Sequence, residues 1–354
     1  MKPPVMPPVE PMLAKSAAGV PVGEYLYEPK WDGYRCIVFR DGPQIELGSR
    51  GGKSLNRYFP ELLTALAAAL PPRCVVDGEI VVVADGRLDF DRLADRIHPA
   101  ESRVRLLAQR TPASFIAFDV LALGDEDLTG WPFAHRREVL TGLLVDRKPR
   151  GDRQVHVTRA TADAQVARGW FERFEGAGLD GIVAKPLDGK YTPGERTMIK
   201  VKHERTADVV VGGYRLHKSG PVVGSLMLGL YGADGVLNYV GGSSAFTMAR
   251  RARLVEELKP LLLGAGQVHP WLGAAEDETH RRPGAPNRWN AGKDTSFVAL
   301  RPESVCEVRY DQLQSGRFRH NAQFARWRPD RDAASCTYDQ LEVPVPYDLG
   351  DVFE

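Results

Sequence analysis

Cysteine is scarce in this chain of 354 residues. The four cysteines, Cys36, Cys74, Cys306 and Cys336, are widely spaced, and no two of them form a Cys-x-x-Cys pair. The sequence therefore indicates neither a zinc site nor a disulfide framework. This cysteine usage fits a reducing cytosol.

Long apolar runs are also missing. No stretch approaches the roughly 18–20 consecutive apolar residues that a membrane-spanning helix needs. The first residues, Met1-Lys2-Pro3-Pro4, do not begin the apolar core of a signal peptide. The hydrophobic fraction of 43% and the charged fraction of 26% are ordinary for a soluble globular protein. We therefore expect a cytoplasmic protein with no membrane partner, long enough for two domains.

The chain has almost no net charge, +1 at pH 7, which at first argues against a nucleic-acid partner. The distribution is uneven, however. Residues 201–331 carry 19 Lys and Arg against 13 Asp and Glu, whereas residues 332–354 carry six acids and no base. A basic module therefore stands beside an acidic tail. On charge alone, a nucleic-acid-binding surface and an ordinary solvated face remain equally open.

Turn signals and hydrophobic patterns predict a mixed arrangement of strands and helices before residue 203. Strands are expected over residues 34–40 and 44–48, joined as a hairpin at Asp41-Gly42, and over 74–83, 114–121, 181–184 and 198–202. Helices are expected over residues 60–70, 92–107, 132–144 and 162–176, and a break at Pro99 is left open.

The character of the chain changes near residue 208. Short strands rich in Val, Tyr and Gly are expected at 208–215, 223–231, 236–241 and 304–310, with one helix at 247–262. Several strands with a single helix suit an OB-fold barrel, which is a nucleic-acid-binding architecture. Residues 264–296 are rich in Gly, Pro, His and Trp and are expected to form a long loop.

Lys30 stands just before the first predicted strand, in the segment Glu28-Pro29-Lys30-Trp31-Asp32-Gly33-Tyr34-Arg35. A solvated lysine, with a pKa of about 10.4, is a poor nucleophile at neutral pH. We expect neighbouring cations and partial burial to lower the pKa of Lys30 and free its lone pair. Taken alone, Lys-x-Asp-Gly is more often a surface lysine before a strand.

Further polar motifs follow Lys30, and each has a simpler alternative. Asp77-Gly78-Glu79 interrupts an apolar run, where acids are costly to bury unless they are paired or bind metal, although a hairpin turn would also fit. Phe118 could simply belong to the core. Lys200 and Lys202 point to one face of a strand, where like charges can also protect an edge. The cluster at residues 326–331 could be a solvated face.

In this order the motifs resemble those of the covalent nucleotidyltransferases, which comprise ATP-dependent DNA ligases, RNA ligases and mRNA capping enzymes. The resemblance covers residues 10–331 and is strongest to ATP-dependent DNA ligases of the compact bacterial C-type and to the ligase domain of D-type end-joining ligases. It implies an α+β adenylation (nucleotidyltransferase) domain at 1–203 with antiparallel, ATP-grasp-like sheets, an OB-fold β-barrel at 204–331 and an acidic C-terminal tail at 332–354.

The resemblance also implies roles for individual residues. Lys30 would attack the α-phosphate of ATP and carry AMP, Glu28 would read the adenine amino group, and Phe118 would stack on adenine. The implied nucleotide contacts are Glu28, Arg35, Arg50, Glu79, Phe118, Arg196, Lys200 and Lys202. The implied partners of Mg²⁺ or Mn²⁺ are Glu79, Asp180 and Asp32, and Asp180 stands where most family members have glutamate. The implied pyrophosphate-orienting residues are Arg326, Arg328 and Asp330, followed by Arg331 where lysine is usual.

The implied function is sealing of nicks in duplex DNA through a lysine–AMP and then a DNA–adenylate intermediate, with DNA repair as the expected setting and the nucleoid as the expected location. Partners that act in end joining or repair, such as Ku, are left open. An RNA ligase or a capping-type enzyme is the nearest alternative. A non-catalytic nucleic-acid-binding protein is the other, and the intact Lys30, Glu79, Lys200 and Lys202 argue against it.

Overall fold

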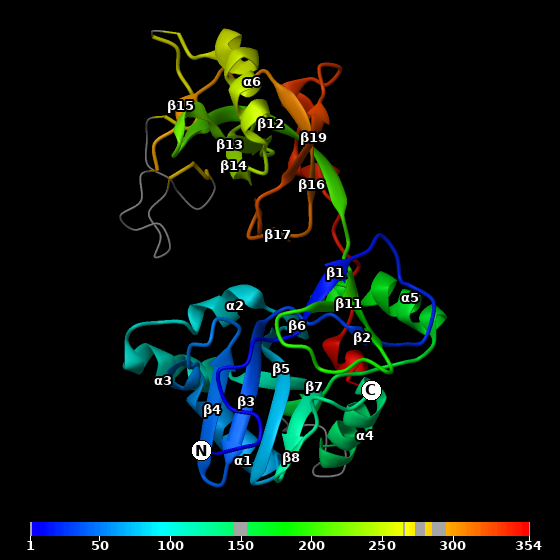
Figure 1. Cartoon of the computed structure of the whole chain (residues 1–354). Helices are drawn as coiled ribbons and strands as arrows, with labels where there is room; N and C mark the ends of the chain where they lie inside the picture. Colours follow the sequence, from blue (N-terminus) through cyan, green and yellow to red (C-terminus); the bar gives the residue numbers. More distant parts are fainter. Residues whose placement is uncertain (1, 145–153, 265, 273–279, 285–294, 354) are drawn as a thin grey trace. The chain divides into compact units, whose positions relative to one another are not determined.

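The computed structural model describes residues 2–144, 154–264, 266–272, 280–284 and 295–353. The chain forms two compact units (Figure 1). The N-terminal unit comprises Met1–Lys202 together with Pro344–Glu354, and the C-terminal unit comprises His203–Val343. The first crossing between the units thus falls at Lys202–His203, and a second crossing follows at Val343–Pro344.

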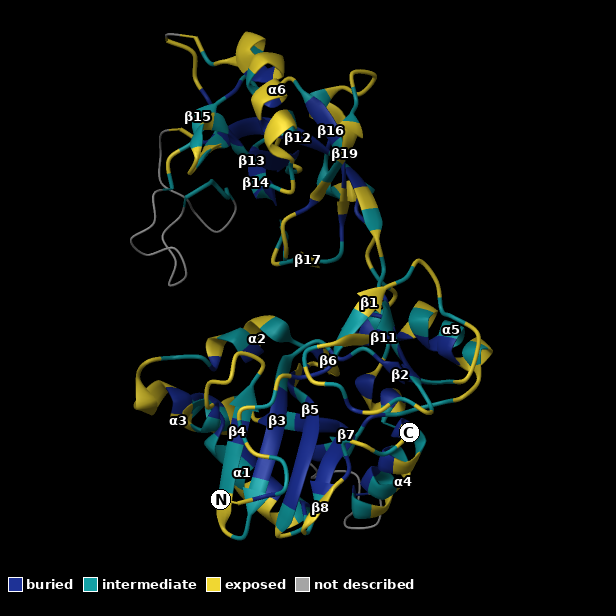
Figure 2. Cartoon of the chain, viewed as in Figure 1, coloured by how far each residue is buried: buried dark blue, intermediate teal, exposed yellow. Residues whose placement is uncertain are grey.

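The larger sheet of the N-terminal unit has the order β4-β3-β5-β7-β8. Its strands are β3 (Tyr34–Asp41), β4 (Gln44–Ser49), β5 (Arg73–Ala84), β7 (Ala113–Leu123) and β8 (Glu126–Asp127), with β6 (Arg87–Leu88) beside β5 and β9 (Val155–Val157) beside β7. Only the β7–β9 pair is parallel among the pairs described in this sheet. Strands β3, β5 and β7 are deeply buried, because apolar side chains line both of their faces (Figure 2).

The predicted hairpin between β3 and β4 is confirmed, since Asp41 pairs with Gln44 across the turn. The alternative of a turn at Asp77-Gly78-Glu79 is wrong, because these residues lie inside the continuous strand β5. In the β3–β5 ladder, Glu79 stands opposite Arg35. Asp77 and Glu79 are two residues apart, so both point to the face of the sheet that carries Arg35.

The smaller sheet has the order β1-β11-β10-β2. Its strands are β1 (Leu13–Ser16), β2 (Tyr25–Pro29), β10 (Ile182–Pro186) and β11 (Arg196–Val201), and the β1–β11 pair is parallel while the other pairs are antiparallel. Lys30 directly follows β2. Its backbone N–H donates to Gly181 O at 2.8 Å, and its carbonyl accepts from Asp180 N–H at 2.8 Å. The Lys30 backbone is therefore fixed against the start of β10.

The helices of the N-terminal unit are α1 (Pro60–Ala69), α2 (Phe90–Asp95), α3 (Glu101–Arg110), α4 (Phe133–Leu144) and α5 (Ala164–Arg173). The prediction of one helix over residues 92–107 is wrong in its bounds, and the break left open at Pro99 is confirmed. Proline lacks the N–H that a helix interior requires. No helix within the described part of the chain is long and apolar enough to cross a membrane.

The C-terminal unit is built on an antiparallel sheet of the order β14-β13-β12-β16-β19. The strands of this sheet are β12 (Arg205–His217), β13 (Gly220–Tyr231), β14 (Leu237–Ser243), β16 (Val305–Tyr310) and β19 (Gln323–Trp327), with β15 (Val298–Ala299) beside β12. The strands β17 (Leu313–Gln314) and β18 (Arg317–Phe318) form a separate two-stranded sheet. The predicted helix is α6 (Met248–Leu258), capped by Thr247, which accepts from Arg250 N–H. Sheet and helix together confirm the OB-fold arrangement. Much of the predicted loop 264–296 lies outside the described residues.

The structure divides the segment 332–354, which the sequence analysis treats as one acidic tail. Cys336 and Leu341 are buried in the core of the C-terminal unit, whereas Leu349 and Val352 are buried in the core of the N-terminal unit. The chain end accordingly lies in the N-terminal unit (Figure 1). Apolar residues between the acids account for this division, because burying them removes apolar surface from water.

Candidate active site

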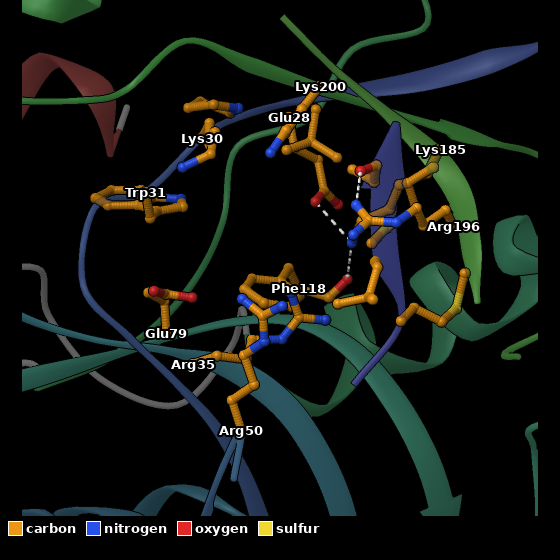
Figure 3. A pocket seen from close by; sticks show the side chains of 16 residues that line it. Glu28, Lys30, Trp31, Arg35, Arg50, Glu79, Phe118, Lys185, Arg196 and Lys200 are labelled. Atoms are coloured by element: carbon orange, nitrogen blue, oxygen red, sulfur yellow. Dashed lines mark hydrogen bonds and ion pairs between the residues drawn. The ribbon is translucent and has the colours of Figure 1, made fainter. Parts of the chain in front are cut away.

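A cavity of about 190 Å³ lies beside Lys30, between the two sheets of the N-terminal unit (Figure 3). Its polar and aromatic lining consists of Glu28, Lys30, Trp31, Arg35, Arg50, Glu79, Phe118, Lys185, Arg196 and Lys200. Among the residues implied as nucleotide contacts, only Lys202 does not line it. The fold thus brings residues from six separate segments of the sequence to one cavity that also holds Lys30.

Lys30 is paired with an acid in this structure. Its Nζ donates to Asp180 Oδ2 at 2.7 Å, and Lys202 Nζ lies 2.7 Å from the same oxygen. Burial lowers the pKa of Lys30, but the negative charge and hydrogen bond of Asp180 act against it, and the pKa ends above its ordinary value. The prediction of a lowered pKa is therefore wrong for this state, because the charge and hydrogen bond of Asp180, with the charges of Glu79 and Asp32, outweigh the effect of burial.

Lys200 behaves in the opposite way. Burial, followed by the positive charges of Lys202 and Lys30, lowers the pKa of Lys200. Lys30 and Lys200 therefore differ in the direction of their pKa shifts: Lys30 is paired with a carboxylate, whereas Lys200 is repelled by neighbouring positive charges. Asp180 is the group that separates them, since it accepts from Lys30 and not from Lys200.

Substitution of Asp180 by asparagine is expected to shift the pH dependence of the Lys30 amine. Removing the carboxylate removes the charge that raises the pKa of Lys30, so the amine loses its proton at a lower pH. In Asp180→Asn, the midpoint of the pH profile for covalent labelling at ATP concentrations well below saturation, which reports the free protein, should move to lower pH. Asp188→Asn, which changes an exposed acid, is the matched control and should leave the midpoint in place. An unchanged midpoint in Asp180→Asn would show that Asp180 does not set the pKa of Lys30.

A second ion pair lies on the opposite wall of the cavity. Arg35 donates from Nε and Nη2 to the two carboxylate oxygens of Asp77, both at 2.6 Å, and Tyr191 donates to Asp77 at 2.7 Å. The Arg35 guanidinium lies over the Phe118 ring, 4.4 Å from its centroid. Burial raises the pKa of Glu79 to about 7, although Arg35 and Lys30 act to lower it. Glu79 can therefore change charge near neutral pH.

Glu28 is almost fully buried, and two cations hold it. Lys185 Nζ lies 2.8 Å from Glu28 Oε2, and Arg137 Nη1 lies 3.3 Å from Oε1. Lys185 also donates to the backbone carbonyl of Phe118 at 3.0 Å, and its Nζ lies 4.6 Å from the centroid of the Phe118 ring. Lys185, Arg137 and Asp77 received no role from the sequence. Asp77 stands in the segment Asp77-Gly78-Glu79, and Lys185 directly follows the strand predicted over residues 181–184, whereas nothing in the sequence near Arg137 marked it.

The three acids implied as metal partners do not gather into a metal site. Within the described ranges of the chain, no group of three or more His, Cys, Asp or Glu side chains could hold a metal ion. Asp180 is occupied by Lys30 and Lys202, and only Glu79 of the three lines the cavity. Mg²⁺ usually binds through one or two carboxylates together with substrate phosphates and water. The donor set fits a Mg²⁺ ion that arrives with a triphosphate, and does not fit a cage made by the protein.

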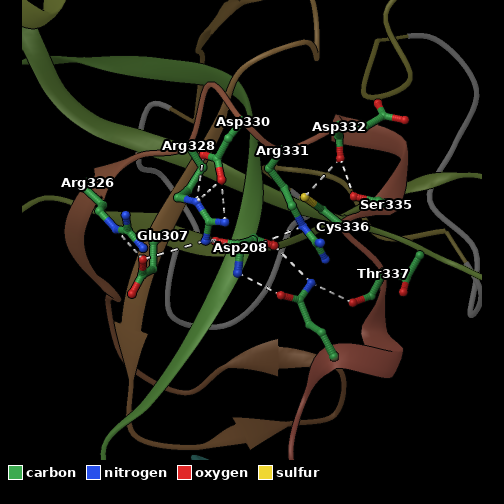
Figure 4. A network of polar contacts seen from close by, with 11 residues as sticks. Asp208, Glu307, Arg326, Arg328, Asp330, Arg331, Asp332, Ser335, Cys336 and Thr337 are labelled. Carbon is green, nitrogen blue, oxygen red and sulfur yellow. Dashed lines mark hydrogen bonds and ion pairs between the residues drawn. The ribbon is translucent and has the colours of Figure 1, made fainter.

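The remaining predicted residues belong to the C-terminal unit and form a network of their own (Figure 4). Arg328 Nη1 donates to both oxygens of Asp208, at 2.9 and 3.0 Å, and its Nη2 donates to Asp330 at 2.8 Å. Arg326 donates to Glu307 at 2.7 Å. The hydrogen bond from Arg328 lowers the pKa of Asp330 to about 2. Asp208, which the sequence analysis did not single out, thus holds the guanidinium of Arg328.

Comparison with known proteins gives consistent results for both units. Residues 11–202 match the family model described as "ATP dependent DNA ligase domain", and residues 219–331 match "ATP dependent DNA ligase C terminal region". The chain is 57% identical to DNA ligase C of Mycobacterium tuberculosis, over 99% of each chain. It is 31% identical to the multifunctional non-homologous end joining protein LigD of Mycolicibacterium smegmatis, over 91% of this chain and 38% of that protein.

One solved structure supports the fold alone. A Lig E DNA ligase matches with a TM-score of 0.56 at 19% identity, covering 90% of this chain and 98% of the other. The match extends over both the strand-rich N-terminal unit and the C-terminal unit. It agrees with the α+β architecture and the OB-fold described above.

Proposed function

Because the chain belongs to the family of ATP-dependent DNA ligases, we propose that it seals nicks in duplex DNA by chemistry that begins at Lys30. The observation that carries this proposal is the cavity, which places the Lys30 amine among the side chains suited to a purine nucleotide. The Lys30 amine attacks the α-phosphate of ATP, the bond to the β-phosphate breaks, pyrophosphate leaves, and AMP stays on the amine through a P–N bond. The 5′-phosphate at the nick then attacks this AMP, and the P–N bond breaks to free the amine. Finally the 3′-hydroxyl attacks the 5′-phosphate, which seals the nick and releases AMP.

We propose that Glu28 and Phe118 recognise the adenine base. Two cations contact the Glu28 carboxylate and fix its position, so it offers a placed acceptor to the adenine amino group. Phe118 supplies a ring face at the cavity, where a base can stack. Guanine has a carbonyl oxygen where adenine has this amino group, and a carboxylate cannot donate to it. The site should therefore prefer ATP.

We propose that the cationic side chains around Lys30 bind the phosphates of ATP. Lys200, Arg196 and Arg50 line the cavity and can neutralise the charge that builds up during phosphoryl transfer. Lys202 lies two residues beyond Lys200, outside this lining, and forms an ion pair with Asp180. Glu79 would hold Mg²⁺ or a ribose hydroxyl from the opposite wall, with Asp180 and Asp32 as further partners. The metal would supply charge neutralisation at the phosphates.

The Lys30–Asp180 pair must loosen before Lys30 can attack. Lys30 shares its proton with a carboxylate only 2.7 Å away, so its lone pair is not free in this state. Asp180 has a second partner in Lys202, which can retain the carboxylate when Lys30 departs. We infer that nucleotide and metal binding draw Asp180 away from Lys30. This step makes labelling depend on the bound nucleotide and not only on solvent pH.

The C-terminal unit is proposed as the DNA-gripping part. Its OB-fold is an architecture used for nucleic-acid binding, and residues 201–331 carry more basic than acidic side chains. Phosphate contacts would supply most of the affinity and would weaken with salt. The same unit would bring Arg326, Arg328 and Asp330 to the pyrophosphate by turning on the connection near His203–Thr206. The proposed domains are 1–203 for adenylation and 204–331 for the OB-fold, followed by the segment 332–354. The structure divides this last segment between the two units at Val343–Pro344.

The setting proposed is DNA repair, on nucleoid DNA in the cytoplasm. The similarity to a protein named for non-homologous end joining supports this setting, and it makes end-joining proteins candidate partners. An RNA ligase or a capping-type enzyme is the alternative activity.

The test is a substrate comparison with the full chain. A duplex with one nick should be sealed with ATP and not with GTP. The protein should be labelled by α-labelled ATP and not by α-labelled GTP. Nicks with RNA on either side of the break should be sealed more slowly than an all-DNA nick. Equal labelling by GTP would remove the roles of Glu28 and Phe118, and a preference for RNA strands would favour the RNA ligase alternative.

A further inference from the structure

The last described residues of the chain return to the N-terminal unit and pack beside the active site. Leu349 and Val352 are buried in the core cluster that also contains Trp31 and Tyr27. The backbone N–H of Leu349 donates to Gly86 O at 2.8 Å, and Arg159 donates to Asp351 O at 3.2 Å. Residues 344–353, here called the C-terminal strap, are thus held by apolar burial and by backbone hydrogen bonds.

The backbone of the C-terminal strap packs closely against Gly176. A Cβ atom at this position would overlap Val345 O and would lie 2.7 Å from Tyr347 N. Only the absence of a side chain lets the strap backbone approach so closely. Tyr347 then packs on Phe174, with ring centroids 5.4 Å apart.

The end of the strap reaches the residue next to Lys30. The Phe353 ring stacks on Trp31 with a centroid distance of 5.4 Å, and on His156 with a centroid distance of 4.3 Å. The Trp31 indole N–H donates to Thr158 Oγ1 at 2.7 Å. Trp31 lines the cavity and is only 5% exposed, so its ring is a fixed part of the cavity wall. Phe353 supports that wall from a part of the chain more than 300 residues away.

We propose that Phe353 is a positioning residue for the first chemical step, because it fixes the Trp31 side of the loop that carries Lys30. The proposal rests on the function proposed for Lys30. Lys30 and Trp31 are adjacent in the chain, so a shift of the indole moves the backbone from which the lysine side chain extends. A small displacement of a reacting group slows a reaction strongly, by about 100-fold for a shift of about 1 Å.

The strap also gives the C-terminal unit a second covalent connection to the N-terminal unit. The chain crosses at Lys202–His203 and again at Val343–Pro344. Pro344 and Pro346 restrict the backbone of the second crossing. The segment that positions Trp31 is therefore continuous with the unit that carries Arg328.

The experiment uses four variants of the full chain. Phe353→Leu keeps most of the apolar volume and removes the ring, and Phe353→Tyr keeps the ring. Gly176→Ala displaces the strap without altering it. Val352→Ala is the matched control, since Val352 is fully buried in the same core but has no ring to stack on Trp31. For each variant we would measure self-adenylation in a single turnover, its ATP dependence, sealing of a pre-adenylated nick, and the thermal midpoint.

A positioning role predicts a step-specific effect. Phe353→Leu and Gly176→Ala should slow self-adenylation at saturating ATP by about 10- to 100-fold. Sealing of a pre-adenylated nick does not use the Lys30 amine as nucleophile and should change by no more than about twofold. Phe353→Tyr should restore self-adenylation, and Val352→Ala should lower the thermal midpoint without separating the two steps.

Three results would overturn the inference. These are equal slowing of both steps in Phe353→Leu, the same pattern in Val352→Ala, or a Phe353→Tyr variant as slow as Phe353→Leu. Failure of the proposed function looks different, because the unsubstituted protein would then lack AMP on Lys30.

Discussion

Lys30→Ala is expected to abolish covalent labelling of the protein by α-labelled ATP and, with it, ATP-dependent sealing of a nick. Lys200 also lines the cavity and has a lowered pKa, so this substitution also asks whether the Lys200 amine can replace Lys30 as the nucleophile. We expect that it cannot. Lys30 is fixed at its backbone by Gly181 and Asp180, whereas Lys200 extends from the neighbouring strand β11. Nucleophilic attack requires alignment as well as a free lone pair.

The controls for Lys30→Ala separate chemistry from folding. Lys53→Ala, which changes an exposed lysine outside the cavity lining, should label at the normal rate. Lys30→Ala should still seal a nick that already carries AMP on its 5′-phosphate, because that step needs no lysine nucleophile. Labelling of Lys30→Ala at the unsubstituted rate would show that another residue attacks ATP.

Arg328→Ala is expected to slow self-adenylation by roughly 10³- to 10⁵-fold, the scale of a lost transition-state arginine. In the structure, Arg328 is bound by Asp208 and Asp330 within the C-terminal unit. Its guanidinium is thus held in a defined orientation before any nucleotide is present. The role proposed for it is to orient pyrophosphate as it departs, which applies only while a triphosphate is bound.

Two comparisons make the Arg328 prediction specific. Sealing of a pre-adenylated nick should be much less affected, because no pyrophosphate leaves in that step. Arg328→Lys keeps the charge but loses the forked geometry that meets Asp208 and Asp330 and that suits phosphate oxygens, so it should recover only part of the rate. If Arg328→Ala slows both steps equally, or only the sealing step, Arg328 contacts DNA and its role in orienting pyrophosphate is lost.

The strands and the order of the motifs could be predicted from the sequence because they depend on local patterns. Apolar runs mark β5 and β7, and the Asp-Gly signal marks the turn between β3 and β4. Lys200 lies in β11 and Lys202 follows the end of that strand, and their spacing of two residues predicts side chains on one side of an extended chain. The resemblance then supplied roles for residues such as Phe118, which local patterns alone would place in the core.

The electrostatics of the site could not be predicted, because they depend on which charges the fold brings together. Asp180 is 150 residues from Lys30 in the sequence, yet it lies within hydrogen-bonding distance of the Lys30 amine and helps to reverse the expected direction of the Lys30 pKa shift. Arg137 reaches Glu28 from a helix that carries no motif. These contacts are long-range, and no local pattern records them.

The same limit applies to the C-terminal strap. Its acids led to the prediction of an acidic tail at 332–354, whereas Leu349 and Val352 are buried and Phe353 stacks on Trp31. The apolar residues are too few and too widely spaced to indicate a helix or a strand. Their burial depends on the close approach of the strap backbone to Gly176 and on the N-terminal core, which only the assembled fold defines.

The most direct test of the account is to find the residue that carries AMP. The full chain would be incubated with α-labelled ATP and Mg²⁺ and without DNA, digested, and analysed by mass spectrometry that preserves the phosphoramidate bond. The account predicts AMP on Lys30 alone. AMP on Lys200, or on any other residue in place of Lys30, would contradict it.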